Sequence, residues 1–290
     1  MIEVKEARFR ASSRATLRQR DAACAVGASG IEFYSWLATR FRLRDVILPD
    51  LDGEKPERAA EAVRALWGQG RGALPNLLQL SEAHGLRVMS LPMIAHTVDA
   101  FSLWRDAEPY VFLSTMKTAE RSRFDLAHEI GHLVMHSRGH EGDLEAEADA
   151  FAASFLMPAD LLLARVGREP ALPAVLRLRS HYGVAALTML RRLHDLGRLS
   201  DNAYRMDCVA LAQRGCRSGE VGGLPREPSQ VFRQTFEALR SNNVTAEQAA
   251  REVGLWASDL HDLTFGHFVA PVESRGDAAR TPVRAALRAV

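Results

Sequence analysis

The stretch Arg123-Phe-Asp-Leu-Ala-His128-Glu129-Ile-Gly-His132 decides how the rest of this sequence is interpreted. Its apolar residues recur at helical spacing, and Thr118 is suited to cap the start of that helix. Two histidines four residues apart lie on the same helical face, so both imidazoles can reach one metal ion. Glu129 leaves the helix about 100° away from His128, given 3.6 residues per turn. It therefore points aside from the metal but can reach a metal-bound water.

This spacing of histidines and glutamate matches the signature of zinc-dependent peptidases. Chance would produce it about 0.02 times in a chain of this composition, so two unrelated histidines on a polar face are the weaker interpretation. A catalytic zinc ion usually takes three protein ligands and a water. His136 lies eight residues beyond His128, roughly 12 Å along the helix, which is too far for the same ion. His140, in a loop, is a weak candidate.

A second helix, expected from Leu144 to Met157, is a better source of the third ligand. It carries Glu145, Glu147 and Asp149 among many alanines and phenylalanines, so we expect it to be largely buried. Buried carboxylates need a partner or a metal. Glu145 and Asp149 share one face, which allows Glu145 to bind the ion while Asp149 holds a histidine ring. Glu147 remains the alternative ligand.

These two segments together resemble the ImmA/IrrE metallopeptidases. The resemblance is most specific over residues 118–158, where Glu145-x-x-x-Asp149-Ala-Phe-Ala-Ala-Ser-Phe-Leu-Met-Pro158 follows the histidine helix. It extends more loosely over residues 55–265. The family often has asparagine where this chain has Asp149.

The resemblance implies a role for each matching residue. The two zinc histidines, the catalytic glutamate and the glutamate ligand of the family fall on His128, His132, Glu129 and Glu145. It further implies a zincin-like core of the gluzincin type, one zinc ion per chain, and cleavage of a helix-turn-helix repressor protein. The alternative is a transcription regulator or sensor that binds metal without cutting. The intact Glu129 favours the enzyme, because a sensor needs only the metal ligands.

The remaining pattern places strands early and helices late, which is typical of an α+β fold. Expected strands are 86–91, 100–104 and 110–113, with 105–109 as a hairpin loop between the last two. Expected helices are 14–27, 31–42, 57–67, 77–84 and 119–136 in the first half of the chain, and further helices follow to about residue 268.

We expect four consecutive domains or segments. Residues 1–54 form an N-terminal helical extension, since no clear N-terminal helix-turn-helix precedes the core. Residues 55–165 form the metallopeptidase core, residues 166–270 a helical C-terminal subdomain, and residues 271–290 a flexible tail rich in Pro, Gly, Ala and Arg.

Composition excludes several classes of protein. With 47% hydrophobic and 25% charged residues, the chain is not wholly disordered. A net charge of +1 argues against avid binding of nucleic acid. The segment 244–260 has small and apolar residues where a helix-turn-helix needs them. The following recognition helix would present Asp259 and Asp262, which repel phosphate, so a structural helical hairpin is the better interpretation.

The cell compartment follows from the cysteines and the N-terminus. The 3 cysteines form no Cys-x-x-Cys pair, which fits a reducing environment. The charged N-terminus lacks the apolar region of a signal peptide, and no stretch approaches the roughly 18 apolar residues of a membrane helix. We therefore expect a soluble cytoplasmic protein with a protein substrate.

Overall fold

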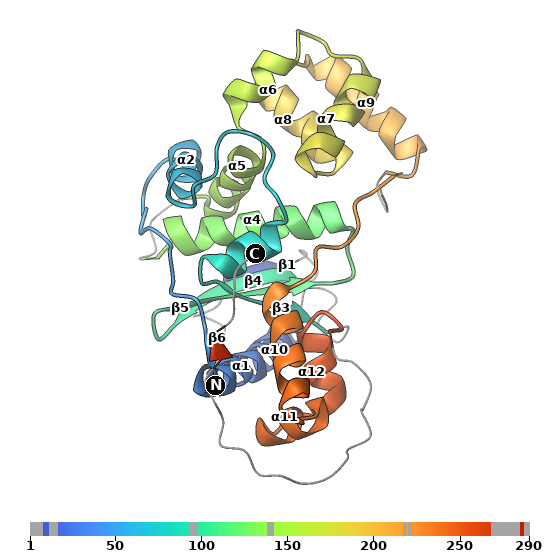
Figure 1. Cartoon of the computed structure of the whole chain (residues 1–290). Coiled ribbons are helices and arrows are strands. Elements are labelled where there is room, and N and C mark those ends of the chain that lie inside the picture. The colour runs from blue at the N-terminus through green and yellow to red at the C-terminus, as the bar shows by residue number, and fades with distance from the viewer. Residues whose placement is uncertain are drawn as a thin grey trace. The chain divides into compact units, whose positions relative to one another are not determined.

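The computed structural model describes residues 8–11, 17–92, 98–137, 142–216, 219, 222–267 and 285–286 (Figure 1). His140 and all of the expected tail 271–290 except 285–286 lie outside these residues. Helices and a small sheet are both present, so the predicted α+β class is confirmed. None of the helices described has the length and apolarity needed to cross a bilayer.

Spatial contacts divide the chain into two compact units, each of which combines segments that are distant in sequence. The sheet unit consists of Met1–Ile47, Leu78–Met116 and Pro228–Val290. The helical unit consists of Leu48–Leu77 and Lys117–Glu227. The consecutive domain ranges given above are not tested by this division and stay a prediction.

A four-stranded sheet with the order β1-β4-β5-β3 forms the centre of the sheet unit. Strand β4 pairs antiparallel with β1 and β5, and β3 runs parallel to β5. The three predicted strands are confirmed as β3, β4 and β5. The bounds are β1 (Arg8–Ala11), β3 (Arg87–Leu91), β4 (Val98–Arg105) and β5 (Glu108–Ser114), and a separate parallel pair joins β2 (Phe41–Arg42) to β6 (Ala285–Ala286).

The hairpin between β4 and β5 is tighter than the sequence suggested. The strands continue to Arg105 and Glu108, which pair with each other, so only Asp106 and Ala107 form the turn. Both have positive φ, 50° and 62°. Two such residues make a two-residue turn of the type that matches the natural twist of paired strands.

The prediction of two N-terminal helices is wrong, because one helix, α1 (Leu17–Arg40), spans both. Gly30, which lies between the two predicted ranges, is inside α1. A Cβ at Gly30 would lie 2.6 Å from Met89 Sδ and 2.8 Å from Phe112 Cε1. Because Gly30 has no side chain, α1 can pack closely against the sheet.

Helices α1, α10 (Gln230–Ser241), α11 (Ala246–Glu252) and α12 (Ala257–Leu263) complete the sheet unit. Their buried faces and the strands share one apolar core. Within it the rings of Phe101 and Phe112 stack with centroids 4.6 Å apart. Other large members are Phe33, Leu37, Met89, Phe232, Leu260 and Leu263.

Two helices end at glycines that differ in their surroundings. Helix α3 (Leu77–Ala83) is followed by Gly85, with φ +86°, where a Cβ would lie 2.6 Å from Val46 Cα. Helix α2 (Pro56–Leu66) is followed by Gly68, with φ +64°, where a Cβ would meet nothing within 4 Å. Both need the left-handed conformation, but only Gly85 also needs to be small.

We expect Gly85→Ala to lower the free energy of unfolding by about 2–5 kcal/mol, because a left-handed alanine and a backbone clash add. Gly68→Ala is the matched control and should cost only about 1 kcal/mol. Urea unfolding of both variants measures the difference. Equal losses would show that the approach to Val46 imposes no constraint.

A buried carboxylate holds the start of α10. Glu82 is 3% exposed and accepts hydrogen bonds from the Ser229 hydroxyl and from the backbone N–H groups of Gln230 and Val231. Burial raises the pKa of Glu82 to about 7, although these hydrogen bonds oppose the rise. A proton on Glu82 is therefore held more tightly in the folded protein than in the unfolded chain.

The contribution of Glu82 to the free energy of unfolding therefore falls as pH rises. The stabilisation is fully present below the unfolded pKa of 4.5 and is lost as pH rises through about 7. The difference of about 2.5 pKa units corresponds to roughly 3 kcal/mol. We expect the stability advantage of wild type over Glu82→Gln to shrink by about that amount between pH 4.5 and pH 8, measured by chemical unfolding. A difference independent of pH would contradict this.

The helical unit contains the two helices of the predicted site, both close to their expected bounds: α4 (Ala119–Met135) and α5 (Leu144–Leu156). Arg64 of α2 is buried and donates to the carbonyl oxygens of Phe155, Gly70 and Gly72, which ties α2 to the end of α5. The remaining helices are α6 (Ala159–Arg165), α7 (Leu172–Tyr182), α8 (Ala186–Asp195) and α9 (Asp201–Gln213).

Candidate metal centre

Helix α4 is fixed at its start and along its length. The Thr118 hydroxyl accepts a hydrogen bond from the backbone N–H of Arg121 at 3.4 Å, which confirms the predicted N-cap. In the middle of the helix, a Cβ on Gly131 would lie 3.0 Å from Phe151 Cδ1. The missing side chain lets α5 pack closely on α4. This packing places the acidic residues of α5 beside the histidines of α4.

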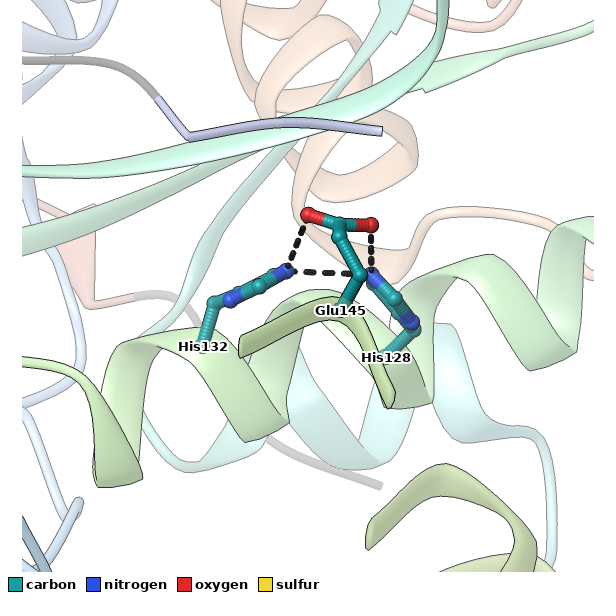
Figure 2. Close-up of side chains that lie close together, drawn as sticks. All are labelled: His128, His132 and Glu145. Carbon is teal, nitrogen blue, oxygen red and sulfur yellow. Dashed lines mark hydrogen bonds and ion pairs between the residues drawn. The ribbon is translucent and has the colours of Figure 1, made fainter. Parts of the chain in front are cut away.

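The three predicted ligand side chains point toward one another (Figure 2). The Nε2 atoms of His128 and His132 lie 3.0 Å apart. The carboxylate of Glu145 places Oε2 at 3.4 Å from His128 Nε2 and Oε1 at 3.3 Å from His132 Nε2. Ligand atoms of all three residues lie within 4.8 Å of one another. The structure thus brings together the residues that the sequence singled out.

The proton positions make this cluster suitable for a cation. His128 Nδ1 lies 2.8 Å from Asp149 Oδ1. A carboxylate can only accept, so a neutral His128 carries its proton on Nδ1 and keeps a lone pair on Nε2. That lone pair faces His132 Nε2 and the carboxylate of Glu145. A divalent metal ion fits this set of two imidazole nitrogens and a carboxylate, and Asp149 takes the supporting position predicted for it.

The expected burial of the α5 carboxylates is wrong. The side chains of Glu145 and Asp149 are 56% and 53% exposed, whereas His128 and His132 are almost fully buried. Helix α5 buries a neighbouring face, through Ala148, Phe151 and Ala152 among others. The acids therefore contact the buried rings from the solvent side.

The charge states suit metal binding. Burial lowers the pKa of His132 to about 4, although its contact with Glu145 opposes this. Burial would raise the pKa of Glu145, but contacts with His128 and His132 outweigh it and lower the pKa well below its ordinary value. At neutral pH the imidazole is therefore neutral and the carboxylate ionised, which are the forms that bind a metal.

Sequence reasoning missed the part that His136 plays. Its Nδ1 lies 2.8 Å from Nδ1 of His132, and its Nε2 lies 3.0 Å from Oε2 of Glu147. Glu147, the alternative ligand, thus contacts His136, while the ligand cluster contains Glu145. The four-residue spacing from His132 to His136 was the available signal, since it places the two rings on one face.

Glu129 follows His128 directly on α4 and is completely buried. Its position on the helix, about 100° from His128, separates it from the ligand face. It is the acid of α4 nearest in sequence to both histidines.

The segment that contains these residues is similar to a known protein family. Residues 81–194 match the family model described as Peptidase_M78, the IrrE N-terminal-like domain. This segment of the chain is similar to the ImmA/IrrE metallopeptidases. No curated protein matches the chain. The family match bears out the resemblance found in the sequence and the zincin-like fold, and it implies a peptidase that uses a metal.

We expect Glu145→Ala to abolish metal binding, because it removes one of the three clustered side chains that can bind an ion. Glu147→Ala should still bind one ion, because Glu147 lies outside the cluster. Metal content after loading with zinc and gel filtration measures both. Loss of the metal from Glu147→Ala with retention by Glu145→Ala would refute the ligand assignment.

Proposed function

We propose that this metallopeptidase is a zinc-dependent endopeptidase that cleaves a helix-turn-helix repressor protein and so relieves transcriptional repression. The observation that carries the proposal is the convergence of His128, His132 and Glu145 within 4.8 Å, with Glu129 next to the first histidine. The peptidase class and the need for a metal come from the family. The zinc ion, its single site and the repressor substrate are the proposed parts.

Zinc suits the donor set, because two imidazoles and one carboxylate are a common catalytic ligand set for this ion and leave a fourth position open. When bound, zinc would supply Lewis acidity toward a water molecule and the scissile carbonyl. His128 and His132 offer nitrogen ligands from one rigid helix, and Glu145 offers an oxygen ligand from a second. A site built on two packed helices holds its geometry better than one on loops.

Glu129 is proposed to move the protons of the reaction. Its carboxylate takes a proton from the attacking water and passes it to the amine that leaves when the peptide bond breaks. The same residue therefore acts first as a base and then as an acid. Its complete burial keeps bulk water from competing for that proton.

The proposed substrate follows from the resemblance to the ImmA/IrrE proteins. The nearly balanced charge of this chain supports a protein substrate more than nucleic acid. A cytoplasmic substrate fits the 3 cysteines, which form no Cys-x-x-Cys pair and suit a reducing compartment.

We expect Glu129→Gln to keep the fold and bind zinc but to lose proteolysis by about 10²–10⁴-fold, the usual contribution of a general base. The variant keeps the size of the side chain and removes only its basicity. The assay is cleavage of a helix-turn-helix repressor encoded nearby, followed by electrophoresis, since a generic protein such as casein is a poor probe of a specific peptidase.

The exposed Glu61 on α2 provides the matched control, and Glu61→Gln should cleave like wild type. Full cleavage by Glu129→Gln would refute the proposed mechanism. A wild-type protein that releases the repressor from DNA without cutting it would make the site that of a sensor.

A further inference from the structure

A row of three groups leads away from the ligand cluster along the interface of α4 and α5. His132 Nδ1, the ring nitrogen that faces away from the cluster, lies 2.8 Å from His136 Nδ1. The other nitrogen of His136 lies 3.0 Å from Glu147 Oε2. Both rings are nearly fully buried, at 2% and 1% exposed, while the Glu147 side chain is 32% exposed.

The carboxylate at the outer end decides where the protons lie. Glu147 can only accept, so His136 carries a proton on Nε2 and donates it. A neutral His136 then has a lone pair on Nδ1, which accepts a hydrogen bond from Nδ1–H of His132. With its proton on Nδ1, His132 keeps the lone pair of Nε2 directed at His128 and Glu145.

Both ligand histidines therefore have a hydrogen-bond partner at Nδ1, the ring nitrogen that faces away from the cluster. His128 donates from Nδ1 directly to Asp149 of α5, whereas Nδ1 of His132 is linked to Glu147 of α5 through the ring of His136. Groups that hold the far nitrogen of a ligand histidine fix its tautomer and its ring orientation.

We propose that His136 and Glu147 are positioning residues, which we call the His136–Glu147 relay, and that they orient His132 and keep its Nε2 free for the metal. The relay rests on the metal site of the proposed function. It gives a supporting role to Glu147, which the sequence left as an alternative ligand. It gives the same role to His136, which lies too far along the helix to bind the ion itself.

The first test measures zinc affinity by competition with a chelating dye. Glu147→Ala and His136→Ala should each weaken binding about 10–100-fold, the usual effect of removing such a support. Glu147→Gln keeps an oxygen that accepts from His136 and should lose less. Because the two residues act in series, the double variant should be no weaker than the weaker single variant. Glu61→Ala is the control and should bind like wild type.

The second test needs no metal. In the metal-free protein, nitrogen NMR of the imidazoles should show altered resonances of His136 and His132 in Glu147→Ala, with His128 unchanged. Asp149→Ala is the matched variant and should alter His128 instead. Because Glu147 is partly exposed, its replacement leaves the packed core intact, and a thermal melt confirms the fold.

Wild-type affinity in Glu147→Ala, or a double variant whose loss is the product of the single losses, would overturn the relay while leaving the metal site in place. A wild-type chain that binds no zinc would instead overturn the proposed function. The imidazole resonances would still decide the relay in that case, since His132 and His136 resonances that ignore Glu147→Ala contradict it.

Discussion

Helix α5 can lie against helix α4 because Gly131 has no side chain. Any Cβ at that position would press on Phe151, which belongs to the buried face of α5. The contact sets the distance between a helix that carries histidines and a helix that carries acids. Metal ligands must be held within about 0.5 Å of their working geometry, so a small separation of the helices would disperse the cluster. The glycine inside the histidine motif thus has a packing role that the chemistry of the motif does not reveal.

The two helices also place their side chains in different surroundings. Neutral imidazoles can be buried at moderate cost when their nitrogens have partners, whereas an ionised carboxylate loses far more hydration energy. The structure accordingly buries His128, His132 and His136 and leaves the acids that contact them partly in water. Burial lowers the pKa of His132, and contacts with His128 and His132 lower the pKa of Glu145. Both conditions favour a metal over a proton as the occupant of the cluster.

The sequence alone predicted the features that depend on residues close together in the chain. Helical periodicity and a cap located α4 and α5, and four-residue spacing paired His128 with His132 and Glu145 with Asp149. It was insufficient where the deciding neighbour is distant. The helices predicted over 14–27 and 31–42 are one helix, and the residues that Gly30 packs against lie far along the chain in β3 and β5. A distance argument set His136 aside as a ligand, but it considered only the ion and not the ring of His132.

The family match covers residues 81–194, yet the strands inside that range depend on segments outside it. Ser90 of β3 donates to the carbonyl oxygen of Asp262 in α12 and accepts from the backbone N–H of Phe265 at 2.8 Å. Glu82 holds the start of α10, and the aromatic core of the sheet includes residues of α1 and α10. Without those helices the apolar face of the sheet would be open to water, at about 25 cal/mol for each Å² exposed. Helices α1, α10 and α12 are therefore part of the folding unit that contains the matched strands, although the family pattern covers none of them.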